Sequence, residues 1–157
     1  MRTTKKATII FFVLISCVGC DQVTKNIANH SLPKFKTISF LNDTLRLQYA
    51  ENQGAFLRLG ATIPKNTRYL ILTCLVSGLL LSLLFYLIMS KKIKNSTTAA
   101  LSLILARGTG NLIDRIFNDG RVIDFINMGI GSVRTGVFNL ADIAITLGTA
   151  WFILLLF

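Results

Sequence analysis

The chain has 157 residues, a length typical of one domain. Hydrophobic residues make up 52% of it and charged residues only 15%, and the mean hydropathy is +0.60. Because a soluble globular domain has about a quarter charged residues, this composition excludes an ordinary cytosolic enzyme. The 17 Lys and Arg against 7 Asp and Glu give a net charge of +10, which in so apolar a chain indicates basic residues flanking membrane spans rather than a nucleic-acid surface. With one His and three Cys, we expect no metal, no cofactor and no disulfide framework. The high hydrophobic and low charged fractions instead indicate a small integral membrane protein.

Four apolar segments predict four membrane-spanning helices, at about residues 7–27, 69–89, 97–113 and 137–157. A helix needs about 20 residues to cross a hydrocarbon core about 30 Å thick. The second and fourth segments have that length without interruption, whereas the first and third reach it only by extending past a charged residue. The expected fold class is an all-α polytopic membrane protein.

The start of the chain allows a second interpretation. A basic beginning, an apolar run and the sequence Cys17-Val18-Gly19-Cys20 resemble a signal peptide with a lipoprotein processing site, and a chain processed at Cys20 would be a lipid-anchored or structural protein. We favour a first membrane span, because three more apolar segments follow and because Asp21 and Lys25 continue the helix.

The two long loops predict a small extracytoplasmic β-sheet. In the first loop, Phe35–Leu41 and Leu45–Tyr49 are rich in β-forming residues and are separated by a turn signal at Asn42, so we expect a hairpin. In the second loop, a turn at Asp119 and Gly120 precedes a short strand at Arg121–Ile126. We expect residues 1–157 to form a single membrane-embedded domain, with loops at about residues 28–68 and 114–136.

The charges are divided between the two sides of the predicted membrane. All seven acidic residues fall on the side of the two long loops, whereas the N-terminus and the Lys91–Asn95 turn carry six basic residues and no acidic one. A count of Lys and Arg alone, 6 against 11, would favour the opposite orientation. We give more weight to the dense Lys clusters, since one opposite loop is long and several of its charges lie in a folded site.

Polar residues from three predicted helices fall at one depth. At about 1.5 Å per residue, Asp21, Asn111 and Asp142 lie about 21–24 Å from the basic side, just inside the far surface of the hydrocarbon core. Ionisable groups at such a depth usually face a cavity or a partner. A polar clamp that only holds helices together is the alternative, and it is weakest for Asp142, which has no basic partner in its own helix. The spacings that place such residues on shared helix faces are Asp21 with Lys25, Asn111 with Asp114 and Arg115, and Asn139 with Asp142.

The acid-rich side offers carboxylates and little else for catalysis. It has no Ser-x-x-Lys arrangement, and the single His30 stands alone in a loop, so nucleophilic Ser or Cys catalysis lacks a base. Two close Asp side chains cannot both ionise cheaply, so that one activates a water while the other donates a proton to a substrate carbonyl. Asp124, on the predicted strand, and Asp142, at the entrance of the last helix, are the obvious pair.

Five blocks of the sequence, spread over nearly the whole chain, resemble the lipoprotein signal peptidases (signal peptidase II). Any one block alone would be a weak signal, whereas five in the family's order are a strong one. The blocks are Asp21-Gln22-Val23-Thr24-Lys25, Asn52-Gln53-Gly54-Ala55-Phe56, Gly110-Asn111-Leu112-Ile113-Asp114-Arg115, Gly120-Arg121-Val122-Ile123-Asp124-Phe125-Ile126 and Phe138-Asn139-Leu140-Ala141-Asp142.

The resemblance implies a four-helix aspartic endopeptidase of the bacterial cytoplasmic (inner) membrane, with both termini cytoplasmic and the active site near the outer face. Such enzymes cleave prolipoproteins on the N-terminal side of a diacylglyceryl-modified Cys. The implied partners are lipid-modified signal peptides, membrane lipids and cyclic-peptide antibiotics, without nucleic acid. Asp124 and Asp142 become the catalytic dyad. The residues implied to bind substrate or support the dyad are Asp21, Lys25, Asn52, Gly54, Asn111, Asp114, Arg115 and Asn139.

One position departs from the family pattern. Arg107 stands where the family usually has a small residue, and we expect this to affect local helix packing and to leave the dyad untouched. An alternative from another class is a small proton- or ion-coupled carrier that uses Asp21, Asp114 and Asp142 as a relay. Against the carrier, the acidic residues gather at one face and none is predicted at mid-bilayer.

Overall fold

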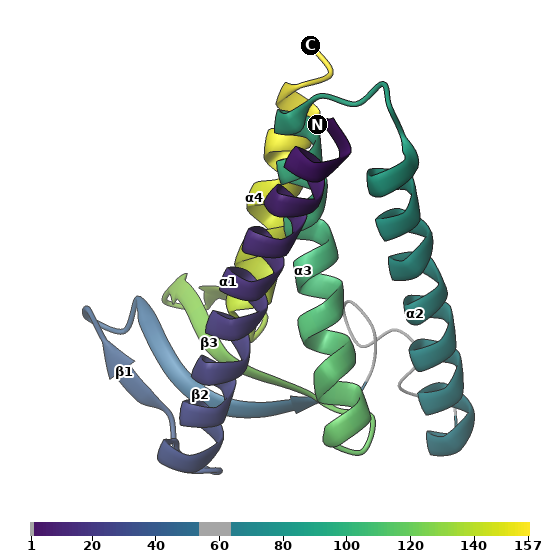
Figure 1. The fold of residues 1–157 in the computed structure, drawn as a ribbon. Helices are drawn as coiled ribbons and strands as arrows, with labels where there is room; N and C mark the ends of the chain where they lie inside the picture. The colour runs from purple at the N-terminus through teal and green to yellow at the C-terminus, as the bar shows by residue number, and fades with distance from the viewer. Residues whose placement is uncertain (1, 54–63) are drawn as a thin grey trace.

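A computed structural model describes residues 2–53 and 64–157 of the chain (Figure 1). In this part of the chain, helices alternate with short strands that form one small sheet. The elements are α1 (Arg2–Ser31), β1 (Ile38–Phe40), β2 (Leu45–Asn52), α2 (Lys65–Met89), α3 (Asn95–Phe117), β3 (Val122–Ile130), β4 (Val133–Arg134) and α4 (Leu140–Leu154).

The helices run side by side, and the sheet lies at one end of them (Figure 1). Both chain termini and the turn between α2 and α3 lie at the other end. A small apolar core near the termini is formed by Ile10 of α1, Leu87 of α2 and Leu105 of α3. The two ends of the molecule therefore differ in kind, because one is packed with aliphatic side chains and the other carries the sheet and the acidic residues.

The outer surfaces of the helices are apolar. Phe11 on α1 is 59% exposed, and Leu81 and Phe85 on α2 are each 66% exposed. Among the described residues, the helices Thr3–Ser31 and Asn66–Met89 are long and apolar enough to cross a membrane. Large apolar surfaces of this kind are unfavourable in water and are stable against lipid.

The prediction of four spans is only partly confirmed, because α3 and α4 do not meet the same test within the described chain. The α3 helix has 23 residues but carries Arg107, Asp114 and Arg115, which lower its hydropathy. The α4 helix has 15 residues, which is about 22 Å. Its predicted start at residue 137 is wrong, since Phe138 pairs in an extended conformation with Ile126 of β3 and Asn139 caps the helix.

The sheet has the antiparallel order β1-β2-β3-β4, which confirms the small β-sheet predicted beside the helices. The predicted hairpin is confirmed, with a shorter first strand and with Leu41, Asn42 and Asp43 at positive φ in its turn. The predicted turn at Asp119 and Gly120 is also confirmed, with φ of 57° and 82°. The strand after this turn extends to residue 130 and is followed by β4, which the sequence did not predict.

A bulge in β2 lies opposite the start of β3. Leu47 pairs with Ile126 and Ala50 pairs with Asp124, so three steps along β2 match two steps along β3. Such a bulge bends the strand and changes the direction of nearby side chains. The irregularity therefore lies beside one of the two predicted catalytic residues.

Gly148 permits close packing between α4 and α3. A Cβ at this position would lie 2.8 Å from the backbone oxygen of Ala100 and 2.8 Å from Cβ of Leu103. Both contacts are shorter than van der Waals distance, and the first is to backbone, which cannot rotate away. Gly78 of α2 is a contrasting case, because a Cβ there would have nothing within 4 Å.

We therefore predict that Gly148→Ala lowers the free energy of unfolding by about 1–3 kcal/mol, the usual effect of overpacking. The matched control Gly78→Ala leaves the stability unchanged or raises it by up to about 1 kcal/mol, because alanine favours the helix. Thermal unfolding in detergent, followed by the fluorescence of the single tryptophan, Trp151, measures both variants. Equal unfolding temperatures for the two variants would contradict this account of the α3–α4 contact.

Candidate active site

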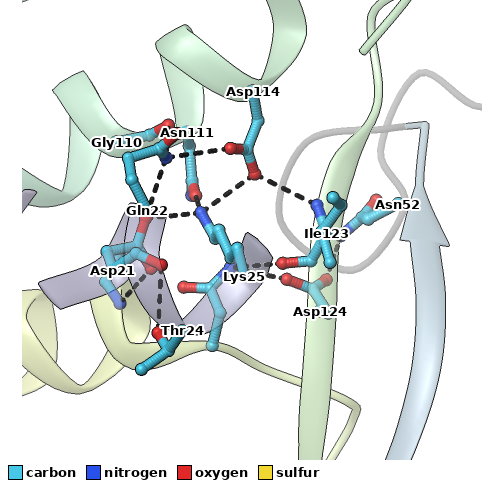
Figure 2. Close-up of polar contacts among 12 residues, drawn as sticks. Asp21, Gln22, Thr24, Lys25, Asn52, Gly110, Asn111, Asp114, Ile123 and Asp124 are labelled. Carbon is cyan, nitrogen blue, oxygen red and sulfur yellow. Dashed lines mark hydrogen bonds and ion pairs between the residues drawn. The ribbon is translucent and has the colours of Figure 1, made fainter. Parts of the chain in front are cut away.

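The amine of Lys25 lies at the centre of a buried cluster between α1 and α3 (Figure 2). Its Nζ is 2.6 Å from Oδ2 of Asp21 and 3.0 Å from Oδ2 of Asp114, and it donates a hydrogen bond of 2.9 Å to Oδ1 of Asn111. The side chains of Lys25, Asp21 and Asp114 are at most 2% exposed. We call these four residues the Lys25 cluster. The pairing of Asp21 with Lys25, and the meeting of α1 and α3 at one level, are thereby confirmed.

The Lys25 cluster satisfies a charge that cannot be left alone in the interior. An ammonium group has three N–H donors, and here it meets three oxygen acceptors. Removing one partner of a buried ion pair leaves an uncompensated charge, which costs about 3–5 kcal/mol. The geometry of α1 against α3 is therefore specified by charge as well as by packing.

The two carboxylates of the Lys25 cluster also accept hydrogen bonds from backbone amides. Oδ1 of Asp21 accepts the N–H of Ala141 at 3.1 Å. Oδ2 of Asp114 accepts the N–H of Ile123 at 3.1 Å (Figure 2). Ala141 directly precedes Asp142, and Ile123 directly precedes Asp124. The cluster thus fixes the backbone immediately before each residue of the predicted dyad.

Gln22 belongs to this region, although the sequence analysis did not single it out. Its Nε2 donates to Oδ1 of Asp114 at 2.9 Å and to the backbone oxygen of Gly110 at 3.1 Å. Gly110 is itself constrained, because a Cβ there would lie 2.7 Å from Oδ2 of Asp21. The available signal was spacing, since Gln22 is three residues before Lys25 and shares its helix face.

Asn139 connects the two residues of the predicted dyad. It caps α4 reciprocally, since its Oδ1 accepts the N–H of Asp142 at 3.1 Å and its own N–H donates to Oδ2 of Asp142 at 3.2 Å. Its Nδ2 donates to Oδ1 of Asp124 at 2.6 Å and to the backbone oxygen of Ile123 at 3.3 Å. The side chain is completely buried. Asn139 therefore contacts both carboxyl groups, that of Asp142 through its backbone N–H and that of Asp124 through its side-chain amide.

Asp124 on β3 is only 4% exposed. Besides the bond from Asn139, its Oδ2 accepts a hydrogen bond of 3.2 Å from Nδ2 of Asn52, at the end of β2. Burial, followed by the nearby negative charge of Asp142, raises the pKa of Asp124 to about 6, although the bonds from the two Asn side chains act in the opposite direction. The carboxylate of Asp142 is thus close enough to influence the ionisation of Asp124.

Asp142 has a basic partner that we did not expect. Nη2 and Nε of Arg107 donate to its Oδ1 at 3.0 and 3.2 Å. The expectation that Arg107 leaves the dyad untouched is wrong. Helical spacing indicates partners of Asp142 only within α4, whereas this arginine reaches it from α3.

The remaining predicted site residues lie in the same region where the structure describes them. Arg115 of α3 is buried and interacts electrostatically with Asp114 and Asp124. Gly54 lies outside the described residues. His30 lies at the end of α1, where its Nδ1 is 2.9 Å from the backbone oxygen of Asn26. In residues 2–53 and 64–157, no group of three or more His, Cys, Asp or Glu side chains could hold a metal ion.

Comparisons with known proteins agree with a helical membrane enzyme. Residues 13–157 match the family described as Signal peptidase (SPase) II. The lipoprotein signal peptidase of Chlorobium phaeobacteroides is 35% identical over 153 residues, covering 92% of this chain and 88% of that protein. The lipoprotein signal peptidase of Staphylococcus haemolyticus is 32% identical over 156 residues, covering 99% of this chain and 95% of that protein.

Two solved structures, each described as a bacterial membrane enzyme determined by the in meso method, have the same fold. Their TM-scores are 0.77 and 0.74 and their sequence identities 27% and 30%; each alignment covers 96% of this chain and 86% or 91% of the other. The chain belongs to the signal peptidase II family. The resemblance seen in the five sequence blocks is confirmed.

We predict that Lys25→Met lowers the free energy of unfolding by about 3–5 kcal/mol, because it leaves two buried carboxylates without their cation. The same substitution at the exposed Lys92, in the turn between α2 and α3, changes it by no more than about 0.5 kcal/mol. Thermal unfolding in detergent gives both values. A Lys25→Met protein as stable as the Lys92→Met protein would show that the cluster does not hold α1 against α3.

We also predict that Asp124 makes stability depend on pH. Because its pKa rises from 3.8 to about 6 on folding, the folded chain binds this proton more tightly. The resulting stabilisation is fully present below about pH 4 and is lost as pH rises through about 6, a change on the order of 3 kcal/mol. Asp124→Asn removes this contribution, whereas Asp119→Asn at an exposed turn retains it. Unfolding temperatures between pH 4 and 8 test this, and parallel curves for wild type and Asp124→Asn would refute it.

Proposed function

We propose that the chain is an aspartic endopeptidase that removes the signal peptide from diacylglyceryl-modified prolipoproteins, on the N-terminal side of the lipidated Cys. Membership of the signal peptidase II family supports the substrate class. The observation that carries the mechanism is the coupling of Asp124 to Asp142, both through the charge of Asp142 and through Asn139.

The proposed reaction uses one protonated and one ionised carboxyl group. The ionised group takes a proton from water, whose oxygen attacks the carbonyl carbon, while the protonated group donates its proton to the carbonyl oxygen. In the resulting tetrahedral intermediate, the C–N bond then breaks, the nitrogen receives the proton taken from water, and a hydroxyl proton returns to the second carboxyl group. The products are a carboxylic acid on the signal peptide, which then ionises in water, and a free amine on the lipidated Cys.

The other predicted site residues receive distinct roles in this proposal. Asn52 and Asn139 orient Asp124, which they contact directly. The Lys25 cluster holds the backbone of Ala141 in α4 and of Ile123 in β3, and we assign it support of the dyad rather than contact with the reacting bond. Gly54 and Arg115 are proposed to contact or position the substrate.

The proposed location follows from the division of the molecule into two ends. We place the end with both termini in the cytoplasm and the end with the sheet at the outer face of the bacterial inner membrane (Figure 1). A signal helix leaves the membrane at that outer level, where its lipidated Cys begins. The exposed apolar side chains of α2 offer a surface to acyl chains, and cyclic-peptide antibiotics are expected to compete with the substrate.

The carrier hypothesis receives less support than the peptidase. Asp21 and Asp114, two members of the suggested relay, are paired with Lys25 and hold backbone amides. Groups fixed in this way are poorly suited to repeated proton uptake and release. The family match is likewise to peptidases.

We predict that Asp124→Asn and Asp142→Asn each reduce cleavage by about 10²–10⁴-fold or more, because each removes a group that transfers a proton. The matched control Asp119→Asn cleaves normally, since Asp119 is 62% exposed and its positive φ suits asparagine equally. The measurement is a gel-shift assay with a lipidated precursor and purified protein in detergent. Near-normal turnover by either dyad variant would overturn the assignment.

A further inference from the structure

Arg107 forms an ion pair with Asp142. Two of its nitrogens donate to a single oxygen, Oδ1, while the other oxygen accepts the capping N–H of Asn139. The arginine and aspartate side chains are 29% and 27% exposed, so the pair is only partly solvated. Its position on α3 is four residues before Asn111 and seven before Asp114, which places it on the helix face that carries the Lys25 cluster.

The two carboxyl groups of the dyad therefore have different electrostatic surroundings. Asp124 accepts hydrogen bonds from two neutral amides, of Asn52 and Asn139, and is almost fully buried. Asp142 is in direct contact with a permanent cation, since arginine does not lose its charge in proteins. A direct cation favours the ionised form of a carboxyl group, whereas burial among neutral donors favours it less.

The other charged groups near the dyad do not reverse this difference. From α1, Lys25 acts on Asp124 through space but is already paired with Asp21 and Asp114. From α3, Arg115 interacts electrostatically with Arg107 and with Asp124. From β3, Asp124 is itself the carboxyl group that faces Asp142. Of these groups, Arg107 is the one seen in direct contact with the Asp142 carboxylate, through two N–H donors.

We propose that Arg107 is a positioning residue that holds Asp142 ionised, which makes Asp142 the base that activates water and leaves the shared proton on Asp124. The inference rests on the proposed peptidase function and deepens it, because it assigns the acid and the base. A purely structural clamp between α3 and α4 would change stability without changing the pH dependence of the reaction.

The test compares Arg107→Gln, which removes the charge, with Arg107→Lys, which keeps it. We expect the acid limb of the kcat/KM profile of Arg107→Gln to move to higher pH by about one unit or more, which is about a tenfold loss at the acid end. Arg107→Lys keeps the wild-type profile. Arg46→Gln is the control, because Arg46 is similarly exposed and pairs with Asp43 in the β1–β2 hairpin. Coincident profiles for wild type and Arg107→Gln, or equal shifts in Gln and Lys variants, overturn the proposal.

A second measurement does not depend on turnover. In the Asp124→Asn background, the infrared carboxyl band that disappears with a further Asp142→Asn substitution reports the titration of Asp142 alone. Adding Arg107→Gln to Asp124→Asn is expected to move its midpoint to higher pH, and an unmoved midpoint refutes the proposal. If wild type fails to cleave the precursor while the midpoint still moves, the peptidase function fails and the effect of Arg107 on Asp142 stands.

Discussion

The burial of the Lys25 amine is the constraint on which the rest of the structure depends. A cation with almost no exposure requires acceptors, and they come from α1 and α3 at once. The same carboxylates also accept hydrogen bonds from backbone amides. Asp21 binds an amide at the start of α4, and Asp114 binds an amide at the start of β3. One buried charge thereby fixes the relative position of three helices and a strand.

The residues that hold the fold together at this end of the molecule differ from the two carboxyl groups that we propose to react. The Lys25 cluster is closed, because its one ammonium group faces two carboxylates and each carboxylate oxygen has a donor. The dyad of Asp124 and Asp142 is less completely matched, and its two members share Asn139 while differing in every other partner. A buried, hydrogen-bonded cluster beside two carboxyl groups with different partners is the arrangement expected of a preorganised site, because the supporting residues fix the geometry of the groups proposed to react.

Much of this architecture could be predicted from local sequence. The apolar runs predicted the helices, and Asn42 and Asp119 marked turns that the structure contains. The start of α4 could not be predicted, because Phe138 is apolar like the helix that follows and joins β3 only through a tertiary contact. The last apolar segment is therefore longer than the helix that it contains. Within the described chain, two helices rather than four are long and apolar enough to cross a membrane.

The sequence by itself determined the membrane class and most of the elements, because hydropathy and helical spacing are local properties, while the five blocks that resemble signal peptidase II indicated the candidate site residues. The pairing of Asp21 with Lys25 is of this kind, since it lies within one helix turn. Only the tertiary structure decided that Asp114 shares the same cation, that Asn139 joins the dyad, and that Arg107 contacts Asp142. These contacts join residues 15 to 89 positions apart, and their distances depend on how helices pack and where a strand begins, which no local pattern encodes.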